Sequence, residues 1–416
     1  MIKKVALNSL LLCLSLLAAG ILAELTLRLA YPKYQQAAEV RYDRDAMTIW
    51  SPRPHRRTET RHPDTGVHHP VIHNALALRQ SREFASLDAA TNIGFFGDSY
   101  TANLSLPSQY SFTEPLDYLL NIEGKYNVLN FGVNGYGTDQ AYLRYTGFDQ
   151  KQKLDHVFYL LCANDLRNIY ESNLFSVDPA GRLERNAPPE SAWWVKLISR
   201  LHLTYLALDV RQRLLYSRTG DVDVYRLAME QAALRARQQQ RFHSEQADLI
   251  QRSFVAEKPN AELEHVLQVF VSLLQEWRDE VQANGARFHV VLLPTGREEL
   301  FRDIIPPDID VVGLLELFEG TVDGFRWAEI TFANDGHWAE EGNRLAALHL
   351  YRYIAEESGL PVMSEGALEE ALHTYYSAFP GGWLPDSSTR PVRTPDAGAA
   401  EAIRSKYTAL ERATES

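Results

Sequence analysis

Short apolar runs alternate with longer amphipathic stretches along the middle of the chain. The predicted strands are 93–96, 127–131 and 155–161, and the predicted helices between them are 107–122 and 138–149. The first helix places Leu116, Leu119 and Leu120 on one face. Nearly continuous apolar strands are typical of a parallel sheet that is covered on both sides. The pattern therefore predicts an α/β fold, with a mainly parallel central sheet between two layers of helices.

The alternation stops after residue 169 and resumes in the last third of the chain. The resumed elements are a helix at 261–283, a strand at 287–293, a short helix at 297–304, a weaker strand at 325–332 and a helix at 340–356. Residues 170–258 are read as a helical insertion that caps the site or contacts a membrane or a partner, or that packs without a function. The sequence thus predicts a catalytic domain at 91–169 and 259–360.

The N-terminus carries an uncharged apolar run. Lys3 and Lys4 precede residues 5–23, which at about 1.5 Å each can cross a hydrocarbon core of about 30 Å. We expect residues 1–30 to be an uncleaved, single-pass anchor in the cytoplasmic membrane. The lysines would stay in the cytoplasm, which puts the rest on the periplasmic or extracytoplasmic side. A cleaved signal peptide with a weak site at 18–20 is the alternative.

Residues 31–90 are interpreted as a juxtamembrane connector with several prolines and little periodicity. It contains His55, His62, His68, His69 and His73. Their spacing fits no standard zinc pattern and no cysteine joins them, so we expect solvated loop histidines and no metal site. Residues 385–416 are rich in Pro, Ser, Thr, Asp and Ala, which favours a largely disordered tail with a frayed helix at 399–410.

Composition narrows the possible functions. Apolar residues make up 45% of 416 residues, enough for a large core, and the formal net charge is −12. That sign argues against a nucleic-acid partner. Cys13 lies in the apolar run and Cys162 follows a predicted strand, so we expect no disulfide.

Ser99, Asp335 and His337 are the candidate catalytic residues. Ser99 follows a buried strand and a Gly-Asp turn, at the strand end where α/β folds place reactive groups. A serine hydroxyl needs a base to take its proton, and His337 can serve, with Asp335 holding the other ring nitrogen. Taken singly, Ser99 could instead be a helix N-cap and Asp335 a turn residue.

Gly135 and Asn164 are the candidate oxyanion-hole donors. Gly135 offers a backbone N–H with no Cβ in the way, and Asn164 offers a side-chain amide after the third strand. The Ser99 backbone N–H would be a further donor. Turn geometry for Gly135 and helix capping for Asn164 are the structural alternatives.

These segments in this order resemble the SGNH (GDSL-type) hydrolase superfamily, over about residues 91–166 and 259–357. The matching blocks are Gly97-Asp98-Ser99, the glycine of 130–135, Asn164, and Asp335 with His337. The resemblance implies a three-layer, flavodoxin-like α/β/α fold and an ester-cleaving or ester-transferring serine, with no cofactor. It assigns Ser99 as nucleophile, His337 as base, and Gly135 and Asn164 as oxyanion donors.

The chain departs from the family pattern at two places. Cys162 stands where the third block starts with Gly, and one residue rather than two separates Asp335 from His337. Asp-x-His-Trp is similar to the block of alginate-type O-acetyltransferases, and 71–84 resembles the lead-in of membrane-anchored members from exopolysaccharide loci. Tyr100, Tyr136 and Trp338 flank the motifs, where aromatic faces suit sugar rings or ordinary packing.

Three functions fit the motifs. The first is a serine esterase that removes acyl groups, most plausibly acetyl, from a cell-envelope or extracellular glycan or a small ester. The second is a polysaccharide O-acetyltransferase that uses the same serine with a sugar hydroxyl as acceptor. The third is a non-catalytic subunit of a polysaccharide assembly machine. Polysaccharide-modification proteins are the partners that these hypotheses imply.

Overall fold

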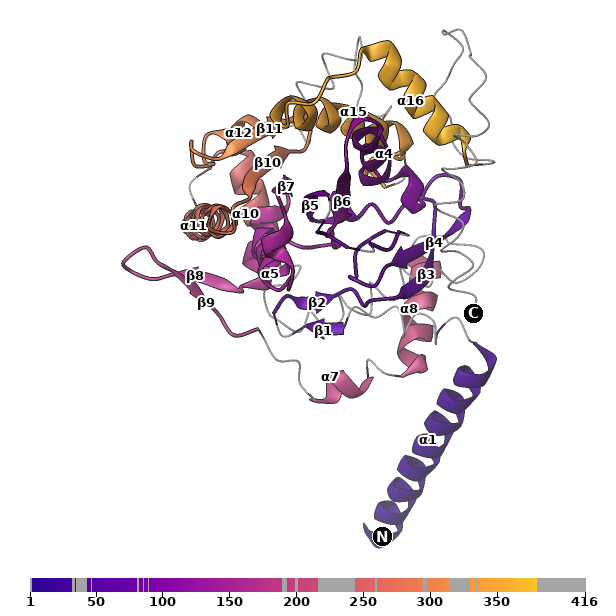
Figure 1. Ribbon diagram of the computed structural model, residues 1–416. Helices are drawn as coiled ribbons and strands as arrows, with labels where there is room; N and C mark the ends of the chain where they lie inside the picture. The colour runs from indigo at the N-terminus through magenta and orange to yellow at the C-terminus, as the bar shows by residue number, and fades with distance from the viewer. Residues whose placement is uncertain are drawn as a thin grey trace.

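The computed structural model describes most of residues 2–379. The residues within that range that it does not describe are 32–33, 35–42, 46, 81, 85, 89, 189–192, 199–200, 216–243, 259, 295–297, 315–329 and 334. Figure 1 shows one α/β body with a long helix, α1 (Ile2–Ala30), projecting from it. The predicted tail at 385–416 lies outside the described residues.

A five-stranded parallel sheet forms the centre of the body. Its strands are β5 (Thr91–Gly97), β6 (Tyr126–Asn130), β7 (His156–Leu161), β10 (Arg287–Leu292) and β11 (Asp310–Gly313). Their order is β11-β10-β7-β5-β6, and every pairing is parallel. The strand order therefore reverses at β5, with β6 on one side and β7 on the other. In open α/β sheets, this reversal is where ligands bind at the carboxyl ends of the strands.

Helices cover both faces of the sheet. On one face pack α4 (Thr113–Glu123), α15 (Glu340–Glu357) and α16 (Glu365–Ser377), and on the other α5 (Thr138–Thr146), α6 (Asp165–Ser172), α10 (Glu245–Val255) and α11 (Ala261–Ala283). Successive strand residues point to opposite faces, so Phe95 joins the first core and Phe96 the second, where it meets Trp277 of α11. The three-layer α/β/α prediction is confirmed.

The predicted elements of the sheet domain match with two exceptions. The predicted helix 107–122 is a 3₁₀ turn at Ser108–Tyr110 followed by α4, which begins at Thr113. Helix 261–283 has the bounds expected, and the four strong strands agree within two residues at each end. The predicted strand 325–332 falls mainly outside the described residues, and only Thr331 forms an isolated bridge, with Trp338. The fifth strand is β11 instead, between the short α12 (Glu298–Arg302) and Leu314.

The connector is more ordered than its sequence suggested. It contains two antiparallel hairpins, β1 (Asp43–Asp45) with β2 (Ile49–Ser51) and β3 (Arg56–Arg61) with β4 (His68–His73). The expectation of solvated loop histidines is wrong for His69 and His73, which are 6% and 8% exposed. Burial lowers the pKa of His69 to about 4 and that of His73 to about 3, with the charge of Arg79 adding to both, so both rings stay neutral.

The described part of the insertion forms short elements rather than a single helical unit. The hairpin β8 (Phe175–Val177) with β9 (Leu183–Arg185) packs against α11, and α10 packs against α6 and α11. Helices α7 (Trp193–Ile198) and α8 (His202–Leu215) lie at the end of the body from which α1 projects (Figure 1). The solvated helix expected over 224–254 is described only from Ser244, and Ile250 and Phe254 of α10 are buried.

Helix α1 is long and apolar enough to cross a membrane. Its segment Leu7–Ala30 has a mean hydropathy of 2.3 and is 6% buried, and among the described residues it is the single helix with these properties. Both cysteines are free: Cys13 is exposed on α1 and Cys162 is buried beyond β7, as expected.

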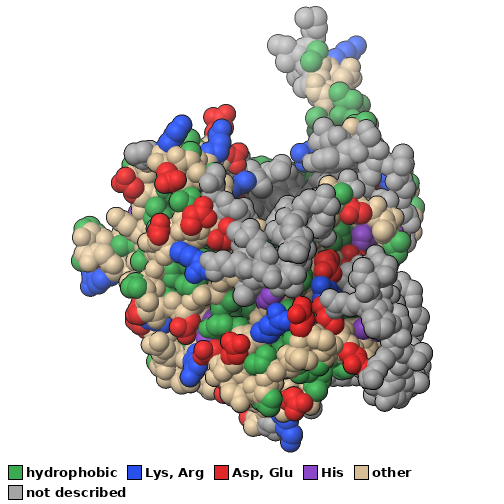
Figure 2. Space-filling model, turned by 90° about the horizontal axis from the view of Figure 1, so that it is seen from above, with side chains coloured by type: hydrophobic (Ala, Val, Ile, Leu, Met, Phe, Trp, Pro, Cys, Tyr) green, Lys and Arg blue, Asp and Glu red, His purple; other side chains and the backbone are tan. Residues whose placement is uncertain are grey.

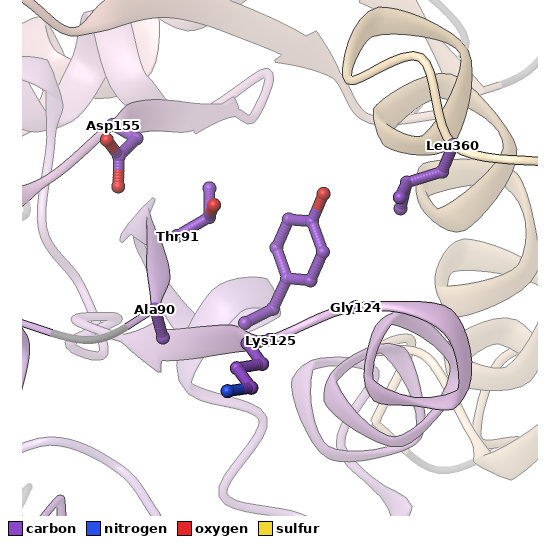
Figure 3. A pocket seen from close by; sticks show the side chains of 7 residues that line it. Ala90, Thr91, Gly124, Lys125, Asp155 and Leu360 are labelled. Carbon is purple, nitrogen blue, oxygen red and sulfur yellow. The ribbon is translucent and has the colours of Figure 1, made fainter.

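Figure 2 shows basic and acidic side chains interspersed over the face in view, without a patch of one sign. A shallow hollow of about 390 Å³ is lined by Thr91, Lys125 and Asp155 among others (Figure 3). These residues stand at the amino ends of β5, β6 and β7, so the hollow lies at the opposite edge of the sheet from Ser99.

Candidate active site

Ser99 begins a single helical turn at the carboxyl end of β5. Gly97 ends the strand with φ +153°, and a Cβ there would come within 2.9 Å of the Leu160 carbonyl oxygen, so the turn requires glycine. Asp98 caps α3 (Ser99–Ala102) by accepting a hydrogen bond from the Tyr100 N–H at 2.9 Å. The N-cap is therefore Asp98, and the Ser99 hydroxyl does not cap the helix. Ser99 lies where the strand order reverses.

The structure brings Ser99, His337 and Asp335 together across 236 to 238 positions of sequence. His337 Nε2 lies 2.7 Å from Ser99 Oγ. Asp335 Oδ2 lies 3.1 Å from His337 Nδ1, in an ion-pair contact that falls short of an aligned hydrogen bond. Gly336, with φ +76°, turns the chain so that the residues on either side of it reach the same site. An Asp335 or a His337 far from Ser99 would have favoured a non-catalytic subunit, and this separation is not observed.

The charge around His337 favours its protonated form. Burial opposes the imidazolium, but contact with Asp335 and the negative charges of Asp335 and Asp98 outweigh it and raise the pKa of His337. Such an imidazole takes a proton readily and holds it, which suits a base that must later act as an acid.

The segment carrying His337 is fixed to the body at its flanks. Trp338 is 1% exposed and belongs to the core, and the Phe332 N–H donates to the His337 carbonyl at 2.9 Å. Nearer the tip, the Tyr100 hydroxyl donates to the Gly336 carbonyl at 3.1 Å. The Ser105 hydroxyl donates to Asp335 Oδ2 at 2.9 Å, the oxygen that faces His337.

Gly135 and Asn164 follow the strands on either side of β5. Gly135 is exposed with φ +77°, a backbone conformation that favours glycine. Asn164 precedes α6, yet its side chain makes no capping bond, and its Nδ2 lies 3.5 Å from Asp98 Oδ2. Asp165 occupies the turn instead, accepting from the Cys162 N–H at 2.6 Å. Helix capping therefore does not account for the Asn164 amide.

Three buried carboxylates lie behind the site. Burial raises the pKa of Asp98, and burial together with the negative charge of Asp98 raises that of Asp165 well above its usual range. Burial also raises the pKa of Asp139 to about 7. The negative charge of Asp98 is one of the influences that raise the pKa of His337.

Sugar stacking and ordinary packing were the two roles open to the aromatic residues beside the motifs. Tyr136 and Trp338 are each 1% exposed, so neither presents a ring face to a ligand and both pack in the interior. Their rings fill the space beneath the site: Tyr136 donates to the Trp50 carbonyl at 2.5 Å, and Trp338 packs edge-on to Tyr100. Tyr100 is partly exposed and stands next to His337, with ring centroids 5.0 Å apart.

Two residues at the site were not found from the sequence. Trp50 of β2 is partly exposed, donates from Nε1 to the Asn134 carbonyl at 3.3 Å and reaches to 3.6 Å from a Cβ built on Gly135. Ser105 bonds Asp335 as described above. No spacing rule connects a connector residue with the Gly135 loop, whereas Ser105, six positions after Ser99, could have been considered.

The connector also supports the segment that follows Ser99. The Arg79 guanidinium donates to the Leu106 carbonyl at 2.8 Å, and a His69 ring nitrogen lies 3.1 Å from the Leu104 carbonyl. Val71 packs against Ala102 and Leu104. Among the described residues no group of three His, Cys, Asp or Glu side chains is arranged to hold a metal ion.

No family model matches the chain, and no curated protein matches it. The solved structures similar to it include the following two. A protein described as lipolytic and of the G-D-S-L family, from Desulfitobacterium hafniense DCB-2, is 11% identical with a TM-score of 0.33, covering 63% of this chain and 98% of that one. TesA is 13% identical with a TM-score of 0.32, covering 63% of this chain and 97% of that one.

Proposed function

We propose that this protein is a serine ester hydrolase of the SGNH type that works through an acyl-enzyme on Ser99. The observation that carries the proposal is the 2.7 Å contact between Ser99 Oγ and His337 Nε2, with Asp335 Oδ2 3.1 Å from the other ring nitrogen. Nucleophile and base within hydrogen-bonding reach, with a third group orienting the base, are the requirement for serine acyl transfer.

In the first half-reaction, Ser99 Oγ attacks the ester carbonyl carbon while His337 Nε2 takes the hydroxyl proton. The carbonyl electron pair moves to oxygen, and the backbone N–H of Gly135 and the side-chain amide of Asn164 are the proposed donors to that oxyanion. The bond to the leaving alcohol then breaks, and protonated His337 returns the proton to the alcohol. The acyl group remains on Ser99.

In the second half-reaction, His337 takes a proton from a water molecule that attacks the acyl-enzyme. The bond to Ser99 Oγ breaks, the serine regains its proton from His337, and a carboxylic acid is released. The negative charge of Asp335 stabilises the imidazolium in both halves, and the Ser105 hydroxyl keeps that carboxylate in place.

The proposed substrate is an O-acetyl ester of a cell-envelope or extracellular glycan. The likeness of Asp335–Trp338 to alginate-type O-acetyltransferases supports this choice. So does α1, whose apolar segment and preceding Lys3 and Lys4 favour an anchor with the body outside the cytoplasm. Trp50, partly exposed beside Gly135, and Tyr100, partly exposed beside His337, are the aromatic side chains proposed to contact a sugar.

The test is labelling of the full chain by a serine-directed fluorophosphonate, followed by peptide mapping. We expect the label on Ser99, and Ser99→Ala should lose both the label and hydrolysis of an activated acetyl ester while its circular dichroism is unchanged. Ser105→Ala is the matched control, since it removes a neighbouring hydroxyl and should still be labelled. A fully active Ser99→Ala variant, or a label on another serine, contradicts the proposal.

The products decide between hydrolysis and transfer. Incubation with an acetyl donor and an oligosaccharide acceptor should release acetate, measured enzymatically, at a rate that the acceptor does not reduce. Acetylated oligosaccharide at the expense of acetate, detected by mass spectrometry, would instead establish an O-acetyltransferase using the same serine.

A further inference from the structure

Helices α7 and α8 expose apolar side chains near the base of α1. In α7, Trp194, Leu197 and Ile198 are 47%, 55% and 43% exposed. In α8, Val210 and Leu214 are 45% and 78% exposed. Figure 1 shows both helices at the end of the body from which α1 projects. Large apolar side chains exposed together on adjacent helices are typical of a surface that meets another phase or a partner.

The opposite face of α8 is fixed to α1. The Glu24 carboxylate accepts hydrogen bonds from the His202 and Leu203 N–H groups at 2.9 and 3.1 Å, so a residue of α1 satisfies the first donors of α8. Tyr205 and Leu208 pack with Leu27 and Tyr34 in one buried cluster. The two helices are therefore held in register with each other.

These contacts fix the position of α7 along the axis of α1, relative to its apolar run. Residues 5–23 carry no charge, and Glu24 is the next residue, so the start of α8 lies where the run ends. The end of α7 is joined to that start, because the Ile198 carbonyl accepts from the Leu201 N–H at 3.0 Å and from the Thr204 hydroxyl at 2.6 Å. If α1 spans a bilayer, α7 lies at its surface.

We propose that α7 inserts into the lipid interface beside α1 and gives the body a second point of membrane contact. The occupant of the exposed face is the outer leaflet, with Trp194 at the headgroup boundary and Leu197 and Ile198 among the upper acyl carbons. Tryptophan prefers this boundary because its ring is amphipathic, and the aliphatic side chains gain by leaving water. The proposal rests on the membrane anchoring proposed above.

The test places an environment-sensitive NBD label at position 198 of the full chain. In a Cys13→Ser background, Ile198→Cys leaves one accessible thiol, since Cys162 is 5% exposed. The labelled protein is reconstituted into phosphatidylcholine–phosphatidylglycerol vesicles with or without 5-doxyl phosphatidylcholine. We expect blue-shifted emission and about twofold quenching by the doxyl lipid, as for a probe buried in the interface.

Two controls make the result decisive. Val362→Cys is matched in exposure, 42% against 43% for Ile198, and lies between α15 and α16, at the other end of the body in Figure 1. It should not be quenched. Native Cys13, labelled in the unaltered chain, lies near the middle of the apolar run, so it is probed with a doxyl group deeper in the acyl chain, 12-doxyl phosphatidylcholine, and should be quenched if the anchor is inserted.

The outcomes separate this inference from the anchor. If Cys13 is quenched but positions 198 and 362 show the same emission and the same quenching, the inference is overturned and the anchor is supported. No quenching at Cys13 overturns both. A blue shift at position 198 without quenching means that protein rather than lipid covers α7, and it also overturns the inference.

Discussion

At the scale of residues, the site depends on how one intervening glycine positions an acid and a base. Asp335 and His337 are two positions apart, a spacing that places both side chains on the same side of an extended strand but about 7 Å from each other. The positive φ of Gly336 turns the chain instead, so that Asp335 Oδ2 reaches His337 Nδ1 while His337 Nε2 reaches Ser99 Oγ. The sequence supplied all three residues, but the orientation depends on a turn that spacing alone does not specify.

Asp335→Asn should move the acid limb of the activity profile. The Asp335 charge raises the pKa of His337, and catalysis needs the neutral imidazole, so wild-type kcat/KM should fall as pH drops through a pKa above the ordinary 6.5. Removing the charge lowers that pKa, and the limb moves to lower pH. At pH 8 the rate should fall on the order of 10²- to 10⁴-fold, because the ring loses its orienting carboxylate.

Ser105→Ala is the comparison for this pH profile. It keeps the carboxylate and removes one neutral hydrogen bond, so we expect a loss of about two- to tenfold and an acid limb close to that of the wild type. An Asp335→Asn profile with its acid limb unmoved would show that Asp335 does not act on His337.

Gly135→Ala tests the oxyanion assignment against backbone strain. Both Gly135 and Gly181 have positive φ, +77° and +81°, so alanine costs about 1–2 kcal/mol of strain at either. Gly181 lies between β8 and β9, with no atom within 4 Å of an added Cβ. We expect Gly135→Ala to lower kcat about 10²-fold by displacing a donor, while Gly181→Ala keeps full activity. Equal activities would remove Gly135 from the oxyanion hole.

At the scale of elements, continuous apolar runs made the four buried strands predictable, because both faces of each are covered. β11 was missed because it has only four residues, Asp310–Gly313, too few to show a periodic pattern. The hairpins of the connector were not predicted for another reason. Its hairpins are stabilised by contacts with distant segments, such as Arg79 with Leu106 and Trp50 with Asn134, which local periodicity cannot encode.

Arg82 is expected to be the main electrostatic tie between connector and sheet domain. It donates to both carboxylate oxygens of Asp117 at 2.9 and 2.7 Å, and the Asp117 side chain is 1% exposed. Arg82→Ala removes the positive charge that pairs with this buried carboxylate, which should lower the free energy of unfolding by about 3–5 kcal/mol. Denaturant titration in detergent, followed by circular dichroism, measures the loss.

The exposed pair Arg287–Glu357 serves as the control for this loss. The Arg287 side chain is 58% exposed, so water screens the pair, and Arg287→Ala should cost less than about 1 kcal/mol. Equal losses for the two variants would mean that the burial of Asp117 does not determine the contribution of Arg82.

At the scale of the whole molecule, a doubly covered parallel sheet brings distant motifs to one edge. Ser99 and Asn164 follow β5 and β7, the two strands at which the order reverses, and Gly135 follows β6 on the other side of β5. Strand order is therefore what converts four separated sequence motifs into one site. The motifs could be found from the sequence, whereas the connector's part in the site required the structure.

The turn at Asp335–His337 has a further consequence for the behaviour of the molecule. Trp338 is buried in the core, but Asp335 is exposed. The Tyr100 hydroxyl bonds the Gly336 carbonyl and the Ser105 hydroxyl bonds Asp335, and these two hydrogen bonds hold the tip of the turn, Asp335 and Gly336, against the body. Such a tip can open at low cost while the sheet stays intact. Mild urea should therefore produce an inactive conformer that no longer reacts with fluorophosphonate. Its near-ultraviolet circular dichroism should be unchanged, and it should regain activity when the urea is diluted. Coincident midpoints for the two signals would show that turn and sheet melt together.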